Sequence, residues 1–156
     1  MSRCFNIFLL LKNSYLYDTI LLGITVSNLS TEVFYGVIGL QMTDNRISSD
    51  WWRKIVEHFV NVGDAFEIRC WKEELDEIRQ ASLYGNPTGD RNEVSVKGVI
   101  SAEILAELLS DEPSDKSIYN KMTKYFTINV ENDKCFFCSA HYGTEMYLER
   151  VSNADI

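Results

Sequence analysis

Residues 125–143, YFTINVENDKCFFCSAHYG, carry the pattern that decides the fold. Apolar, aromatic and β-branched residues fill TINV at 127–130 and KCFFCSAHY at 134–142. The polar run ENDK at 131–134 lies between them and has the composition of a turn. Two strand-like segments on either side of such a turn predict a β-hairpin. The sequence therefore predicts antiparallel pairing near the C-terminus.

The second strand of this hairpin contains Cys135, Cys138 and His141 within seven positions. A zinc-binding C-x2-C places its thiolates on a tight turn, whereas Phe136 and Phe137 are bulky strand formers. In an extended strand Cys135 and Cys138 point to opposite faces. No second C-x2-C or Cys/His pair completes a metal site. We therefore expect a strand here, with no catalytic residue, metal or other cofactor.

Strand-like segments lie at both ends of the chain and helical segments mainly in the middle, without strict alternation. A chain of 156 residues fits one domain. We expect a single α+β domain, 1–156, with a mainly antiparallel sheet and two to four helices packed on it. A mobile loop is expected near 84–93, where Gly, Asn and Pro concentrate. Besides the hairpin, strands are predicted at 3–11, 19–27, 32–43, 64–71 and 93–100, and helices at 48–63, 72–82 and 101–115; the tail from 144 is ambiguous.

Periodicity also predicts which side chains face the core. The segment 64–71 alternates, with Phe66, Ile68 and Cys70 on one face. Glu67, Arg69 and Trp71 then form a wetter face. In the helix at 72–82, Leu75, Ile78 and Ala81 are expected to point inward.

The composition is that of a globular domain, with 46% hydrophobic and 24% charged residues. The apolar run Cys4–Leu11 has eight residues, against about 20 for a membrane span. We interpret it as a buried strand and expect a cytoplasmic protein. Its four cysteines, including Cys70, lie in apolar or aromatic settings that suit reduced core thiols.

The charge is strongly negative and unevenly distributed. A net charge of −8 disfavours binding to nucleic acid or to an anionic membrane, because both need a basic face. Residues 64–77 hold six acidic and two basic side chains, a net −4. Residues 101–115 hold five acidic side chains and no basic one, a net −5. Two short segments therefore account for nearly all of the net charge.

Acidic residues four apart on a helix share one face. That face either keeps the protein soluble or attracts a basic partner. For a binding face, the sequence predicts charged contacts from Glu103, Glu107, Asp111 and Glu112, a second patch of Glu73, Glu74 and Glu77, and an aromatic anchor such as Trp71 or Tyr84.

In size, acidity and lack of a catalytic motif, the chain resembles bacterial toxin-neutralising immunity proteins. The resemblance implies an inhibitor that binds a basic toxin, such as a nuclease, directly. No motif is shared, so no residue roles carry over. The alternative is an enzyme, or a metal or thiol protein, that uses Cys135, Cys138 and His141. A homodimer formed through the N-terminal strands also remains open.

Overall fold

The computed structural model describes residues 8–13, 16–21, 29–34, 37–42, 48–89, 91–110, 113 and 121–151. Before residue 48 it gives the strands and their pairing. The elements in chain order are β1 (Phe8–Asn13), β2 (Leu16–Leu21), β3 (Leu29–Phe34), β4 (Val37–Met42), α1 (Asp50–Phe59), β5 (Ala65–Trp71), α2 (Leu75–Ala81), β6 (Gly85–Gly89), β7 (Glu93–Val99), α3 (Ala102–Ser110), β8 (Thr127–Glu131), β9 (Phe136–Ala140), the 3-10 turn η1 (His141–Gly143) and β10 (Glu145–Glu149).

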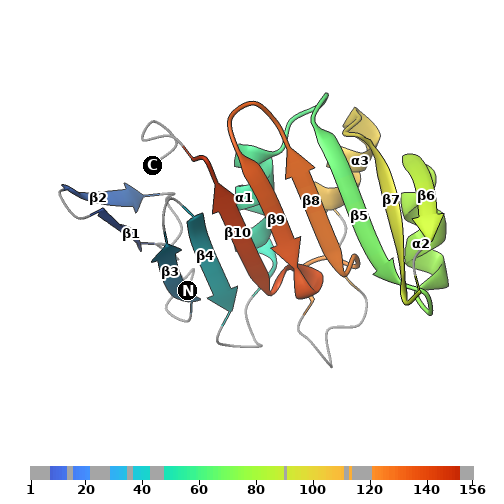
Figure 1. The fold of residues 1–156 in the computed structure, drawn as a ribbon, viewed down its shortest axis with the longest axis horizontal. Coiled ribbons are helices and arrows are strands. Elements are labelled where there is room, and N and C mark those ends of the chain that lie inside the picture. The colour runs from blue at the N-terminus through green and yellow to red at the C-terminus, as the bar shows by residue number, and fades with distance from the viewer. Residues whose placement is uncertain are drawn as a thin grey trace.

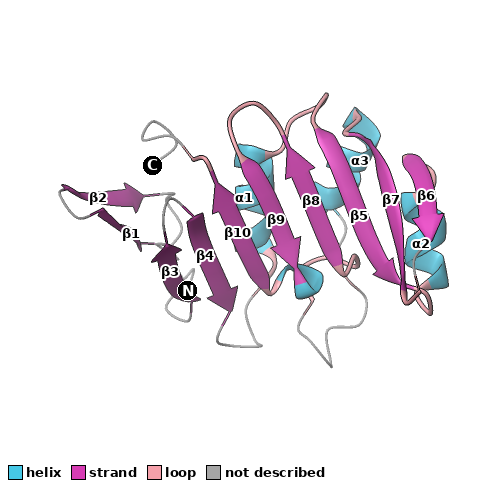
Figure 2. Ribbon diagram, in the orientation of Figure 1, coloured by secondary structure: helices cyan, strands magenta, loops and turns pink. Residues whose placement is uncertain are grey.

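The centre of the fold is an eight-stranded sheet in the order β3-β4-β10-β9-β8-β5-β7-β6 (Figure 1). Every described strand pair in it is antiparallel. Strands β1 and β2 form a separate two-stranded sheet. The three helices lie together behind the large sheet (Figure 2). The predicted α+β fold, with a mainly antiparallel sheet, is confirmed.

Strand β5 shows why the helices cover only one face of the sheet. Its side chains alternate as predicted: Phe66, Ile68 and Cys70 are buried, whereas Arg69 is exposed. The buried side chains belong to the core cluster shared with the helices. The alternate side chains, such as Glu67, emerge on the other face, which we call the open face.

Helix α1 supplies the largest part of the core. Its apolar residues recur at three- and four-residue steps, so Trp52, Ile55 and Val56 all become fully buried. Burial of each large apolar side chain contributes roughly 1.5–3 kcal/mol. The indole Nε1 of Trp52 donates a buried hydrogen bond of 2.8 Å to the Ser139 hydroxyl on β9. The helix is thereby fixed to the middle of the sheet.

Apart from shifted element bounds, two segments differ most from the sequence prediction. The single strand expected at 32–43 is instead the end of β3 and all of β4, paired antiparallel with Phe34 opposite Val37. The expected loop at 84–93 contains β6, which pairs with β7 and forms one edge of the sheet. Pro87 is tolerated in an edge strand. Proline has no backbone N–H to donate, and the outer side of an edge strand has no neighbouring strand to accept that hydrogen bond. The turn-forming composition of 84–93 therefore predicted a loop where the chain forms the strand β6.

The C-terminal hairpin is confirmed as β8 and β9, with Val130 opposite Phe137. Its turn is held by the side chain of Asn132, which accepts hydrogen bonds from the amides of Lys134 (2.9 Å) and Cys135 (2.8 Å). The ambiguous tail adds β10 to the sheet. Within the described ranges, the helices are too short and too polar to cross a bilayer.

Candidate protein-binding surface

The turn after β5 and the first turn of α2 carry a group of carboxylates at the surface. Glu73 and Asp76 are exposed, and Glu77 is half-buried. Neither Glu73 nor Glu77 forms an ion pair with any other described residue. Asp76 pairs with Arg79 at 2.8 Å, but the two side chains are 85% and 75% exposed, so water screens this pair. We call Glu73, Asp76 and Glu77 the acidic patch.

Glu74 has a different environment from its neighbours. One carboxylate oxygen accepts a 2.8 Å hydrogen bond from the backbone amide of Trp71. The other accepts a 2.8 Å hydrogen bond from the hydroxyl of Tyr142. Both oxygens are therefore engaged within the chain. Glu74 ties the loop to the end of β9, whereas the sequence predicted it as a contact for a partner.

Two leucines near the acidic patch face solvent. Leu75 is 65% exposed and Leu83, just beyond α2, is 70% exposed. The expectation that Leu75 points inward is wrong. Helix α2 has only seven residues, and it packs through Ala81, which is fully buried, and Ile78, which is half-buried. This short helix therefore presents apolar and acidic side chains to solvent together.

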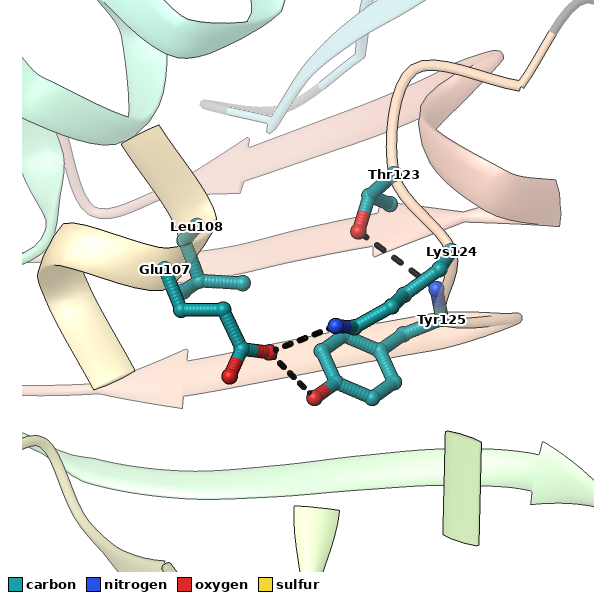
Figure 3. A pocket seen from close by; sticks show the side chains of 5 residues that line it. All are labelled: Glu107, Leu108, Thr123, Lys124 and Tyr125. Carbon is teal, nitrogen blue, oxygen red and sulfur yellow. Dashed lines mark hydrogen bonds and ion pairs between the residues drawn. The ribbon is translucent and has the colours of Figure 1, made fainter. Parts of the chain in front are cut away.

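Helix α3 separates the two acidic residues that the sequence assigned to one face. Glu103 is exposed. The side chain of Glu107 is only 12% exposed and points toward Lys124 and Tyr125 (Figure 3). Its carboxylate accepts hydrogen bonds of 2.6 Å each from Tyr125, Tyr84 and Gln80, and it pairs with Lys124 at 3.1 Å.

These contacts stabilise the ionised form of Glu107. Burial raises the pKa of this carboxyl, but the donors from Tyr125, Tyr84, Gln80 and Lys124 together lower it below its usual value. The hydrogen bond to the carboxylate, with burial, also raises the pKa of Tyr84. The charge of Glu107 is therefore satisfied within the chain, so the acidic face predicted on this helix stays a prediction that rests on its other members.

The remaining predicted contacts on this side, Asp111 and Glu112, lie outside the described residues. The hollow beside Glu107 is lined by Leu108, Thr123, Lys124 and Tyr125 and leaves no space for a ligand (Figure 3). Tyr84, predicted as a possible anchor, is half-buried with its hydroxyl bound to Glu107. The cluster around Glu107 therefore joins α3, the end of α2 and the segment before β8.

Trp71 is the predicted anchor that remains partly accessible. Its ring lies 4.6 Å from that of Phe126, tilted by 45°. Phe126 in turn makes edge contacts with His141 at 5.5 Å and Tyr142 at 5.4 Å. We call these four residues the aromatic cluster. Sequence analysis did not find it, because its members come from three segments that meet only when β5, β8 and β9 pair.

The strand predicted at 134–142 is confirmed over Phe136–Ala140 as β9, whereas Cys135 lies just before it and His141 and Tyr142 belong to the turn η1. Cys135 is buried with its thiol toward the Phe59 carbonyl (3.9 Å), whereas Cys138 is half-buried within β9. Burial raises the pKa of Cys138 to about 11, which disfavours the nucleophilic thiolate. His141 is exposed, and its Nδ1 lies 3.1 Å from Glu145. No three potential metal ligands cluster among the described residues.

The open face of the sheet largely neutralises its own charge. Arg69 pairs with Glu93, and Lys97 lies 3.5 Å from Glu67. Glu67 also accepts a hydrogen bond from the Ser95 hydroxyl. This face therefore offers less unpaired charge than the acidic patch. Comparison of the chain with protein families, with curated proteins and with solved structures found no match.

Proposed function

We propose that the chain is a protein-binding module of the immunity or antitoxin type, which neutralises a basic toxin by direct binding. The observation that carries the proposal is the acidic patch: Glu73 and Glu77 have no ion pair with a described residue, and Leu75 beside them is exposed. Carboxylates arranged in this way attract a basic partner from a distance. An exposed leucine adds the apolar contact that charge alone does not provide.

The proposal shifts the predicted interface from α3 toward the loop before α2. Glu73, Glu77 and Trp71 stay in it, Glu103 lies at its margin, and Glu107 serves to hold the scaffold. We propose a cytoplasmic location, because Cys70, Cys135 and Cys138 are free thiols, as suits a reducing compartment. A toxin nuclease is one suitable partner, because an enzyme that binds nucleic acid carries a basic site.

Affinity capture tests this function. The protein is immobilised and incubated with lysate of its native cell at low and high salt, and retained proteins are identified. The test variant carries Glu73→Lys, Asp76→Lys and Glu77→Lys. The matched control carries Glu57→Lys, Asp133→Lys and Glu149→Lys, three exposed acids elsewhere with the same change in net charge.

We expect one basic protein that binds the wild type and the matched control in a 1:1 complex with purified components. Loss of the acidic patch should weaken its affinity by about 100-fold. A retained enzyme should also lose its activity in the complex. If both triple variants bind equally, or if no basic protein is retained, the acidic patch only aids solubility.

The alternative function, an enzyme or a metal or thiol protein, has less support. Cys135 is buried just before β9, Cys138 is half-buried within β9, and His141 lies beyond the end of the strand. Metal analysis of the purified protein addresses this alternative. Stoichiometric zinc that is lost in a Cys138→Ser variant would favour it over the binding module.

A further inference from the structure

The aromatic cluster lies where β5 and β9 end and β8 begins, at the lower edge of the sheet in Figure 1. Trp71 and Phe126 are its two half-buried rings with the closest contact, 4.6 Å between centroids. Neither ring belongs to the core behind the sheet. Large aromatic side chains that keep partial exposure on a rigid scaffold are typical centres of protein interfaces.

Trp71 differs from the other two tryptophans of the chain. Trp51 and Trp52 are 3% and 0% exposed and belong to the core. Trp71 lies on the open face, and the residue is only partly buried. Since the core does not cover this residue fully, it is available for a ligand that stacks on indole.

The backbone beneath the cluster is held in an unusual conformation. His141 and Tyr142 have φ values of 48° and 61°, in the left-handed region that non-glycine residues seldom adopt. The turn is fixed by hydrogen bonds from the Tyr142 amide to the Phe126 carbonyl (3.0 Å) and from the Met122 amide to the Tyr142 carbonyl (2.8 Å). Gly143 follows at φ 81°, where a Cβ would lie 2.7 Å from that of Met122. The rings are therefore presented by rigid supports.

Two carboxylates lie next to Trp71 along the chain or by contact. Glu73 is exposed two residues beyond it, and the Glu74 carboxylate binds its backbone amide. Of three basic side chains in the same region, only Arg69 has a carboxylate partner among the described residues, whereas Lys72 and Lys121 contact uncharged groups and keep their charge. Lys72 donates to the Arg91 carbonyl, Arg69 pairs with Glu93, and Lys121 lies over the Tyr142 ring at 4.0 Å.

We propose that Trp71 and Phe126 form the binding site for an arginine side chain of the basic partner, with Glu73 as the facing carboxylate. A guanidinium is planar, stacks on aromatic faces and can bind a carboxylate at the same time. A lysine ammonium lacks the planar surface. The inference rests on the proposed function, because it assigns the central contact of the same interface.

Peptides test the site without a known partner. Hexa-arginine, hexa-lysine and hexa-citrulline are titrated into the full chain at low salt, and binding is measured by calorimetry. Iodide quenching of tryptophan fluorescence is followed in parallel. Because Trp51 and Trp52 are buried, protection from iodide reports on Trp71. The variants are Trp71→Ala, Trp71→Phe and Phe126→Leu, each checked for an unchanged melting profile.

We expect hexa-arginine to bind about threefold to tenfold more tightly than hexa-lysine, and hexa-citrulline not to bind. Bound arginine should protect Trp71 from iodide. Trp71→Ala should reduce hexa-arginine to the affinity of hexa-lysine, and Trp71→Phe should restore part of the difference. Phe126→Leu should give a smaller loss.

Equal affinity for the two cationic peptides, or an arginine preference that survives Trp71→Ala, would overturn the arginine site. So would the absence of binding by either peptide. These failures are separate from a failure of the proposed function. If a basic partner is captured through the acidic patch but Trp71 has no effect, the proposed function stands and only the arginine site fails. If no basic partner is captured through the acidic patch, the proposed function fails, whichever peptides bind.

Discussion

The segment 72–77, which runs from the turn after β5 into the start of α2, and helix α3 both contribute strongly to the negative charge, but they place their carboxylates in opposite environments. In the segment 72–77, Glu73 is exposed and has no ion pair with a described residue. In α3, Glu107 accepts hydrogen bonds from two tyrosines and a glutamine and pairs with Lys124. The same residue type is thus left in solvent in one region and supports the fold internally in the other.

The difference shows that sequence charge does not measure the charge available to a partner. A carboxylate whose oxygens are saturated inside the fold contributes little field outside it, whereas a solvated one can steer association. Substitutions at the two regions should therefore separate stability from binding. Stability should respond to Glu107 and its donors, and binding to the acidic patch.

Replacement of Glu107 should have the largest effect on stability. Glu107→Ala leaves the fully buried Tyr125 hydroxyl without the carboxylate that accepts its hydrogen bond and removes the ion pair between Glu107 and Lys124. We expect the free energy of unfolding to fall by about 3 kcal/mol. Urea denaturation followed by circular dichroism measures this change.

Glu73→Ala is the control from the acidic patch, and it should change stability by less than about 0.5 kcal/mol. The comparison fails if the two alanine variants unfold at the same urea concentration. In that case the hydrogen bonds around Glu107 would add nothing beyond the exposed carboxylates of the loop.

Removal of a hydrogen-bond donor to Glu107 should have the next largest effect on stability, and the loss should be larger for the more deeply buried donor. Tyr125→Phe removes a hydroxyl from a fully buried ring and leaves one oxygen of Glu107 with only Lys124. We expect a loss of about 1–2 kcal/mol in the free energy of unfolding. Tyr84→Phe, on a half-buried ring, should cost less because Gln80 still donates to the same oxygen. The reverse order would refute this ranking, and the same urea titrations measure it.

Much of the fold was predictable because short-range periodicity determined it. The alternation in β5, the apolar stripe of α1 and the β8–β9 hairpin are all visible in windows of ten or so residues. The strand β6 was not, because its Gly- and Pro-rich sequence favours turns and only pairing with β7 makes it a strand. Sequence patterns also did not separate the end of β3 from β4, since residues 32–43 are rich in β-branched and aromatic residues throughout.

The candidate site was less predictable, because it depends on contacts between distant residues. Glu107 meets Tyr84 and Tyr125 across 23 and 18 residues, so spacing within α3 cannot reveal that its carboxylate is engaged. Helical spacing likewise predicted that Leu75 points inward, but the short helix α2 packs on the core through other residues and leaves Leu75 exposed. Trp71 was predictable as an anchor, whereas its neighbour Phe126 was not.

Acid titration should distinguish the two kinds of carboxylate. The pKa of Glu107 is lower in the folded chain than in the unfolded one, because its donors outweigh burial. Its contribution to stability is therefore present above the unfolded pKa and is lost as pH falls through the folded pKa. We expect wild type to lose more stability than Glu107→Gln between pH 7 and pH 3, measured by thermal unfolding.

Glu67 is an internal reference for that titration. Burial raises its pKa, but hydrogen bonds from Ser95 and Asn129 and the charge of Lys97 lower it overall. Its acid sensitivity should be the same in wild type and Glu107→Gln, so the difference between the two curves isolates Glu107. Parallel curves would mean that the Glu107 carboxylate titrates alike in the folded and unfolded chains.

The smallest effect should come from the exposed pair between Asp76 and Arg79. Because both side chains lie mostly in solvent, Arg79→Ala should change the free energy of unfolding by less than about 0.5 kcal/mol. The same substitution leaves Asp76 without its cation, so it should strengthen binding of a basic partner or of hexa-lysine at low salt. A variant that binds more weakly would mean that Arg79 itself contacts the ligand. That result would move the interface away from the carboxylates and break the contrast with Glu107.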